Sequence, residues 1–497
     1  MNTCPSAESL HDYYCDYYHS VYPSPCYSNS DSSMDSGLQA ELFGLVSKDV
    51  DMEEYVQHVY GVSKADVDYI RSKEWKLEGL PTYTKLLDEG APEEDLYGPF
   101  KTIMADLFDT FIDSGHKLDV HHASLGKTPL KGIWNVRKPG QLFLFGSHDD
   151  ESPVAWSLAK AFVEFAVAPR AQHAAAGDST TSTTSKEGIA AAAAVASSTP
   201  ELAIPTSSST KRKHCGIDTP DEPKPAPKRP RLAAYTKKES QAAGYALELL
   251  ASTCRRWATG VVIADTQVTL HYYDRMGAIF TQAFNFDEEP WKLALVALAI
   301  GQCSLAQAGF EPLIATNLDT ALSQPLYSLQ NAILKIPNDN SNKIDSDSIE
   351  FVDNLGRGVY SHFEITGNPL YVYGGLTGRG SHVLPGYMVK MVGEDDGDIN
   401  NAAKKLALQA NAKDNMVVKL SWPLEKRTCL EAQTVNSLVN KIPWVKRHLP
   451  KVHCALTIKG KSTGLPRHLF HDMTVAHGLE QRYFTLLFSD RYKHLWE

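Results

Sequence analysis

The chain has 497 residues, about three times the length of a ~150-residue domain, so two or three domains are expected. Hydrophobic residues make up 43% of it, which is enough to bury a sizeable core. The net charge of -10, from 49 Lys+Arg and 59 Asp+Glu, argues against a protein that coats nucleic acids. The eight cysteines form no Cys-x-x-Cys pair, so we expect reduced thiols and neither a disulfide scaffold nor a metal site.

The N-terminal segment has no features of a signal peptide. Residues 1–47 contain no Lys or Arg, and the longest apolar run, Leu293–Ile300, is far shorter than the ~20 residues of a membrane span. We therefore expect a soluble protein without a membrane partner. Residues 1–36 are rich in Ser, Tyr, Asp and Pro and lack an apolar period, which predicts a disordered tail. The alternative is a docking peptide that uses the tyrosines between Tyr13 and Tyr27.

Residues 37–170 have the pattern of the first part of an α+β region. Apolar residues recur at helical spacing in Tyr97–Ile112, which predicts an amphipathic helix. The other elements expected here are helices at Leu38–Val46, Glu53–Val59 and Val154–Val167, and a strand at Gln141–Phe145.

Residues 171–236 interrupt this pattern with an alanine run, Ser/Thr clusters and many prolines, which predicts a disordered basic linker. Two basic clusters lie in it, and their members are Lys211, Arg212 and Lys213, then Lys228, Arg229 and Arg231. Such a pair favours a bipartite nuclear localisation signal, with a nuclear import receptor as partner and a nuclear or nucleocytoplasmic location. A solvated basic linker is the alternative. Direct nucleic-acid binding is not favoured, because no aromatic residues alternate with the charges.

Residues 237–348 have the pattern of the second part of the α+β region. A helix is expected around Ala242–Leu250, followed by three strands at Val261–Ala264, Val268–Tyr273 and Ile279–Phe284. Residues Asp274–Gly277 supply a turn, and Pro290 begins a helix that we expect to reach Gln307.

The last segment, 349–497, contains a glycine cluster between two strand-like runs. Gly378 and Gly380 belong to this cluster, and glycines between strands let backbone N–H groups approach a ligand such as a phosphate. A plain β-hairpin with a flexible tip has the same pattern, and this alternative stays open.

A lysine and a glutamate follow the glycine cluster. Lys419 lies in the strand Asn415–Trp422, on the face opposite Val418 and Leu420. A lysine inside an apolar strand needs a counter-charge or an anionic ligand, and Glu431, on a helix expected at Glu425–Ile442, is a candidate partner. The alternatives are an exposed lysine on an edge strand and a surface glutamate paired with Arg427.

The order of glycine loop, strand lysine, helix glutamate and a further strand at Val452–Ile458 is the plan of a protein-kinase small lobe. At this point the sequence resembles the fungal-type protein kinase (FunK1) family, over roughly 240–497 and more weakly 37–170. The matching stretches are QAAGYALELLAS (241–252), HYYDRMGAIFTQAFNF (271–286), LTGRGSHV (376–383), VVKLSWPLEKRTCLEA (417–432) and LEQRYFTLLFSDRYKHLWE (479–497).

The resemblance implies an α+β fold, in which a family-specific N-terminal region precedes a small lobe of an antiparallel sheet and one helix. It implies ATP as cofactor, with Gly378 and Gly380 on the glycine loop, Lys419 as the ATP lysine and Glu431 as its partner. It also implies that 479–497 is a helical stretch entering the large lobe. One departure is that Val383 stands where the third glycine of G-x-G-x-x-G belongs.

A second departure concerns catalysis. No H-R-D with a following Asn, no D-F-G and no A-P-E motif fits after the predicted helix, so no catalytic residue and no Mg²⁺ ligand is assigned. We therefore expect a truncated or inactive kinase-like protein whose large lobe is missing, or a gene-model error. Its exposed lobe face would take an unknown protein partner. The alternatives are a non-enzymatic nuclear interaction module and a kinase completed by a separately encoded large lobe.

Overall fold

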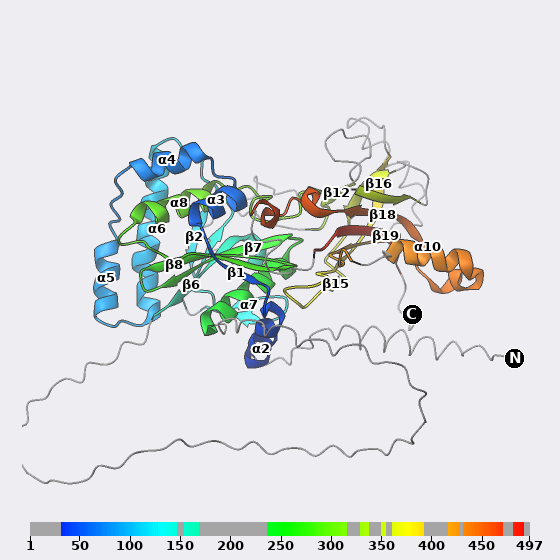
Figure 1. Cartoon of the computed structure of the whole chain (residues 1–497), viewed down its shortest axis with the longest axis horizontal. Helices are drawn as coiled ribbons and strands as arrows, with labels where there is room; N and C mark the ends of the chain where they lie inside the picture. The colour runs from blue at the N-terminus through cyan, green and yellow to red at the C-terminus, as the bar shows by residue number, and fades with distance from the viewer. Residues whose placement is uncertain are drawn as a thin grey trace, which may run out of the picture. The chain divides into compact units, whose positions relative to one another are not determined.

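The computed structural model describes residues 31–126, 128–146, 154–167, 236–315, 329–336, 349–353, 360–391, 416–426, 431–470 and 481–491. All of them belong to one compact unit. Two large sheets and several helices give this part of the chain an α+β fold (Figure 1). The two segments predicted to be disordered lie outside the described residues, except at their C-terminal ends. Residues 31–36 belong to helix α2, and Thr236 caps helix α7.

The first sheet is mixed, with the strand order β1-β9-β8-β7-β6-β5-β2 and the short β10 beside β8. The pairs β1/β9 and β6/β7 are parallel and the others are antiparallel. Its strands are β1 (Val46–Val50), β2 (His121–Ser124), β5 (Gln141–Leu144), β6 (Ala159–Ala166), β7 (Trp257–Ala264), β8 (Gln267–Asp274), β9 (Gly277–Thr281) and β10 (Phe284–Asn285). The separate hairpin is made of β3 (Leu130–Lys131) and β4 (Val136–Arg137).

Helices lie on both sides of this sheet. In Figure 1, α2 and α7 lie on one side, and α3, α6 and α8 lie on the other. The helices of this region are α2 (Asp31–Leu42), α3 (Met52–Tyr60), α4 (Lys64–Ser72), α5 (Leu80–Asp88), α6 (Tyr97–Asp113), α7 (Lys237–Ser252) and α8 (Pro290–Gln302). The amphipathic helix predicted at Tyr97–Ile112 is confirmed as α6, and the three strands around the Asp274–Gly277 turn are confirmed as β7, β8 and β9.

The helix predicted at Val154–Val167 is wrong. The structure has a short 3-10 helix, η2 (Trp156–Leu158), followed by strand β6, which lies between β5 and β7. Seven of the eight residues of β6 are buried, because helices cover both faces of the sheet at this point. A strand buried on both faces has no alternation of apolar and polar residues, so its sequence resembles that of a buried helix.

The second sheet is antiparallel throughout and has the order β11-β12-β14-β16-β17-β19-β18-β13, with β15 beside β16. Its strands are β11 (Ile314–Ala315), β12 (Ile333–Lys335), β13 (Ile349–Asp353), β14 (Tyr360–Ile365), β15 (Tyr371–Val372), β16 (His382–Met391), β17 (Met416–Ser421), β18 (Val452–Ile458) and β19 (Phe484–Asp490). Helix α10 (Glu431–Lys441) and the 3-10 helix η6 (Pro443–His448) follow β17. The shorter 3-10 helices are η1 (Glu93–Leu96), η7 (Gly460–Thr463) and η8 (Pro466–Leu469).

The helix expected within 479–497 is also wrong, because the described part of this stretch contains strand β19. Phe484, Leu486 and Phe488 belong to the main hydrophobic core, whereas Leu487 packs with α10 in a second, smaller cluster. The side chains of β19 therefore alternate between two covered faces. Leu487 is apolar although it lies on the second face, so it interrupts the alternation of apolar and polar residues that would indicate a strand.

A buried ion pair joins the β8–β9 turn to η8. Arg467 Nε donates to Asp274 Oδ2 over 2.7 Å and Arg467 Nη2 donates to Oδ1 over 3.0 Å, and both side chains are fully buried. The same carboxylate accepts hydrogen bonds from the backbone N–H groups of Met276 and Gly277 and from the Tyr272 hydroxyl. The pair therefore shapes the turn and holds the 466–469 segment against the first sheet.

No helix among the described residues is both long enough and apolar enough to cross a membrane.

Replacing Arg467 with Leu leaves the Asp274 carboxylate buried without its counter-charge. We expect the free energy of unfolding to fall by about 3–5 kcal/mol, measured by urea denaturation of the full chain. The control is Arg71→Leu, which removes the ion pair between the surface residues Arg71 and Glu53 and should change stability little. If the two substitutions lowered the free energy of unfolding equally, the buried Asp274–Arg467 pair would contribute no more to stability than a surface pair.

Candidate functional site

Lys419 and Glu431 form an ion pair between strand β17 and helix α10. Lys419 Nζ lies 2.6 Å from Glu431 Oε2, and the two side chains are 23% and 43% exposed. The pair is therefore accessible to a ligand from solvent. Arg427, the alternative partner weighed for Glu431, lies outside the described residues.

The packing of β17 explains why Lys419 faces α10. Val418 and Leu420 belong to the main core, so the alternation of a strand places Lys419 on the opposite face. On that face Ala432 and Val435 of α10 pack against Leu487 of β19 in the smaller cluster. Lys419 pairs in register with Val383 of β16 and Leu487 of β19, so it lies on an interior strand and not at a sheet edge.

Glu431 opens α10 as the structure describes it. A carboxylate in the first turn of a helix interacts favourably with the helix dipole and lies where the unpaired backbone N–H groups gather. The strand lysine is thus held by an oriented carboxylate and stays accessible to solvent. Such a group can bind an anionic oxygen, for example of a phosphate.

Gly378 and Gly380 lie in the loop between β15 and β16, so the expected strand–glycine–strand order is present. Both have positive φ angles, of 96° and 50°, which favour glycine. A Cβ atom on Gly380 would collide with the Arg275 guanidinium. Packing against Arg275 is therefore sufficient to explain Gly380 without a bound phosphate.

The loop from 375 to 380, here called the glycine segment, is held from several sides. Arg275 Nη1 donates to the carbonyls of Gly375 and Leu376 over 2.6 and 3.2 Å. The Gly378 N–H donates to the Arg275 carbonyl, and the Trp422 N–H donates to the Arg379 carbonyl. These bonds connect the segment to the β8–β9 turn and to the end of β17.

Glu41 of α2 binds the glycine segment through its carboxylate. Its Oε2 accepts hydrogen bonds from the backbone N–H groups of Leu376 and Thr377, over 2.8 and 3.1 Å. Two successive amides directed at one anionic oxygen form the kind of arrangement that binds phosphates in other proteins. In this conformation a side chain of the same chain occupies that position.

Burial determines the protonation states of Arg275 and His382, which lie around the glycine segment. It lowers the pKa of the Arg275 guanidinium to about 10, with Tyr373 and Glu41 acting in the opposite direction, so the group stays positive at neutral pH. Burial likewise lowers the pKa of His382 to about 4, and the neighbouring Arg275 charge adds to this effect. His382 is therefore neutral, and Arg275 supplies the positive charge at this position.

Arg275 and Glu41 were not identified from the sequence. Arg275 was visible only as part of a turn, and Glu41 only as part of a helix, because nothing local indicates a partner one hundred or more residues away. The basic clusters at 211–213 and 228–231 lie outside the described residues. Within the described residues, no group of three or more His, Cys, Asp or Glu side chains is placed to hold a metal ion.

The comparisons with known proteins bear on the same region. Neither the curated proteins nor the solved structures yielded a match to the chain. A family model described as fungal protein kinase matches residues 206–463, which is more than half of the chain. The matched range runs from before α7 to the region after β18 and includes Gly378, Gly380, Lys419 and Glu431. The chain therefore belongs to the fungal protein kinase family.

Proposed function

We propose that this chain binds ATP at the Lys419–Glu431 pair and does not itself transfer the phosphoryl group. The observation that carries the proposal is the 2.6 Å contact between a lysine on an interior strand and a glutamate on the following helix. Protein kinases use such a pair to hold the α- and β-phosphates of ATP. The segment 349–497, with strands β13 to β19 and α10, would then be the small lobe, and membership of the fungal protein kinase family supports this assignment.

The proposed lack of phosphoryl transfer rests on the absence of the kinase catalytic motifs from the 497 residues. In kinases an H-R-D aspartate orients the substrate hydroxyl, and the D-F-G aspartate with a catalytic-loop Asn holds Mg²⁺. None of these motifs occurs after Lys419 and Glu431 in the 497 residues. Lys419 can contact the phosphates of bound ATP, but a single lysine does not neutralise all the charge of the transition state for phosphoryl transfer. We therefore expect this chain to bind ATP without turning it over.

Lys419→Ala should weaken nucleotide binding by at least tenfold, because it removes the charge that contacts the phosphates. The measurement is a titration of the full chain with a fluorescent ATP analogue, together with the rise in melting temperature that ATP produces. Lys426→Ala is the matched control, since Lys426 is an exposed lysine in the segment after β17. Equal affinities of the wild type and Lys419→Ala would refute the proposed site. Autophosphorylation with Mg²⁺-ATP that disappears in Lys419→Ala would refute the lack of transfer.

The glycine segment allows a second test. If its amides also bind phosphate, the Glu41 carboxylate competes with the nucleotide. Glu41→Ala should then tighten binding of the ATP analogue several-fold, while Glu239→Ala, which removes a carboxylate from α7, should leave it unchanged. If Glu41→Ala lowers the melting temperature but leaves the affinity for the ATP analogue unchanged, Glu41 has only a structural role.

A second candidate function, a non-enzymatic nuclear interaction module, is favoured by the two basic clusters at 211–213 and 228–231. We propose that they bind an import receptor and direct the protein to the nucleus. A fluorescent fusion of the full chain should accumulate there, and Lys228→Ala/Arg229→Ala should shift it to the cytoplasm. The control is Lys237→Ala/Lys238→Ala, two lysines of the first turn of α7. Cytoplasmic location of the wild-type fusion would count against the proposal.

A further inference from the structure

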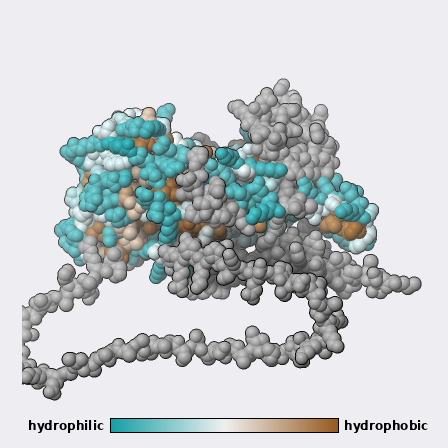
Figure 2. All heavy atoms as spheres, in the orientation of Figure 1, coloured by the Kyte–Doolittle hydropathy of each residue, from teal (hydrophilic) through white to brown (hydrophobic). Residues whose placement is uncertain are grey.

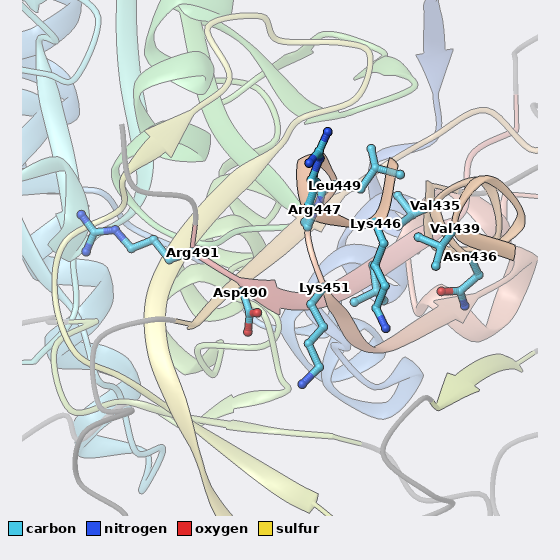
Figure 3. Close-up of a pocket in the computed structure, with 11 residues that line it drawn as sticks. Val435, Asn436, Val439, Lys446, Arg447, Leu449, Lys451, Asp490 and Arg491 are labelled. Atoms are coloured by element: carbon cyan, nitrogen blue, oxygen red, sulfur yellow. The ribbon is translucent and has the colours of Figure 1, made fainter. Parts of the chain in front are cut away.

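A cavity of about 630 Å³ lies beside α10, on the side of the second sheet where η6 leads into β18. Its residues come from α10, from η6 and the turn that follows it, and from the facing ends of β18 and β19 (Figure 3). This volume is within the usual range of ligand-binding clefts. The cavity is separate from the Lys419–Glu431 pair, neither member of which lines it.

The cavity has an apolar wall and a basic rim. Val435, Val439 and Leu449 supply the aliphatic surface. The cations that line it are Lys446, Arg447, Lys451 and Arg491, against the single carboxylate Asp490. That carboxylate accepts a hydrogen bond from His453 Nε2 over 2.6 Å. Lys446, Arg447 and Lys451 are exposed, and none of them forms an ion pair with a carboxylate of the described residues.

The side chains are not all directed the same way. In Figure 3 the side chains of Lys446, Lys451 and Asn436 extend to the same side, whereas Arg447 extends to the opposite side and Arg491 points away from the group. Of the four lining cations, Lys446 and Lys451 extend to a common side in this view. A net positive surface is unexpected on a chain whose total charge is -10.

Two exposed apolar residues belong to the same segment of chain as the lining residues Lys446 and Arg447. Trp444 is 57% exposed and Ile442 36% exposed, and both lie in the segment between α10 and β18. Figure 2 shows a hydrophobic patch over the region where Figure 1 draws α10. Trp444 lies on η6, the same 3-10 helix that supplies the lining residues Lys446 and Arg447. Exposed aromatic residues of this kind are typical of protein-binding surfaces, where they contribute much of the affinity. A small anion would use the lysines but neither Trp444 nor the aliphatic wall.

We infer that this surface is a docking site for an acidic peptide segment of a partner protein, one in which carboxylates alternate with large apolar side chains. The apolar side chains would enter between α10 and the turn at 449–451, and the carboxylates would pair with Lys446 and Lys451. This assignment goes beyond nucleotide binding and does not depend on it. Electrostatic attraction of this kind falls as salt is added, whereas the contribution of the apolar contacts remains.

The test uses a fluorescein-labelled synthetic peptide in which Glu alternates with Leu and Phe. Fluorescence anisotropy should show that the full chain binds it, and Lys446→Glu/Lys451→Glu should weaken the binding at least tenfold. Lys117→Glu/Lys131→Glu, the same charge change at two exposed lysines elsewhere, should weaken it less than twofold. Leu449→Ser should also weaken binding, which separates the apolar contribution from the charge.

Two further probes determine what the surface recognises. An all-Glu peptide of the same length and a single-stranded DNA oligonucleotide should both bind at least tenfold more weakly than the mixed peptide. Equal binding of either probe would show a general polyanion surface and overturn the inference. Absence of binding of the mixed peptide, or equal binding by the wild type and Lys446→Glu/Lys451→Glu, would overturn it as well. None of these readouts requires ATP, so the result is independent of the nucleotide-binding experiment.

Discussion

The β8–β9 turn is the point on which the arrangement of the described residues depends. Asp274 is fully buried, and its carboxylate is paired with Arg467 and hydrogen-bonded to the turn that it begins. The next residue, Arg275, reaches the glycine segment of the other sheet. The hydrogen bonds and the ion pair offset the free-energy cost of removing the carboxylate from water. Either member of the ion pair alone would be a strongly unfavourable buried charge. One turn thereby links the first sheet, the glycine segment and the 466–469 helix.

This linkage constrains the proposed nucleotide site. The amides of Leu376 and Thr377 point at Glu41, and a Cβ on Gly380 would meet Arg275, so the conformation of the glycine segment is set by α2 and by the β8–β9 turn. The Lys419–Glu431 pair, by contrast, depends on β17 and α10 and is partly exposed. The two halves of the proposed phosphate-binding site are therefore held by different parts of the fold. The lysine is accessible, whereas the glycine segment is already hydrogen-bonded to protein groups.

The site was predictable to the extent that its chemistry is local. Alternation in β17 and the helical spacing around Glu431 were enough to put the lysine and the glutamate on facing surfaces, and the structure brings the two together. Gly380 was ambiguous because a phosphate loop and a tight turn against an arginine require the same residue. The basic surface was missed, although four Lys/Arg residues lie in the stretch 441–451, since only the fold shows that Val435, Val439 and Leu449 line the same cavity.

The sequence by itself determined the helices and strands whose two faces differ in polarity, such as α6, and the motif order by which the chain resembles its family. These depend on neighbours within a few residues, where the period of apolar residues carries the information. Tertiary structure decided β6, which is buried on both faces within the main core, and β19, whose apolar residues are divided between the main core and the smaller cluster. It also decided the partners of Asp274, Arg275 and Glu41. A buried charge is stable only beside its counterpart, and where that counterpart lies along the chain is a property of the folded structure.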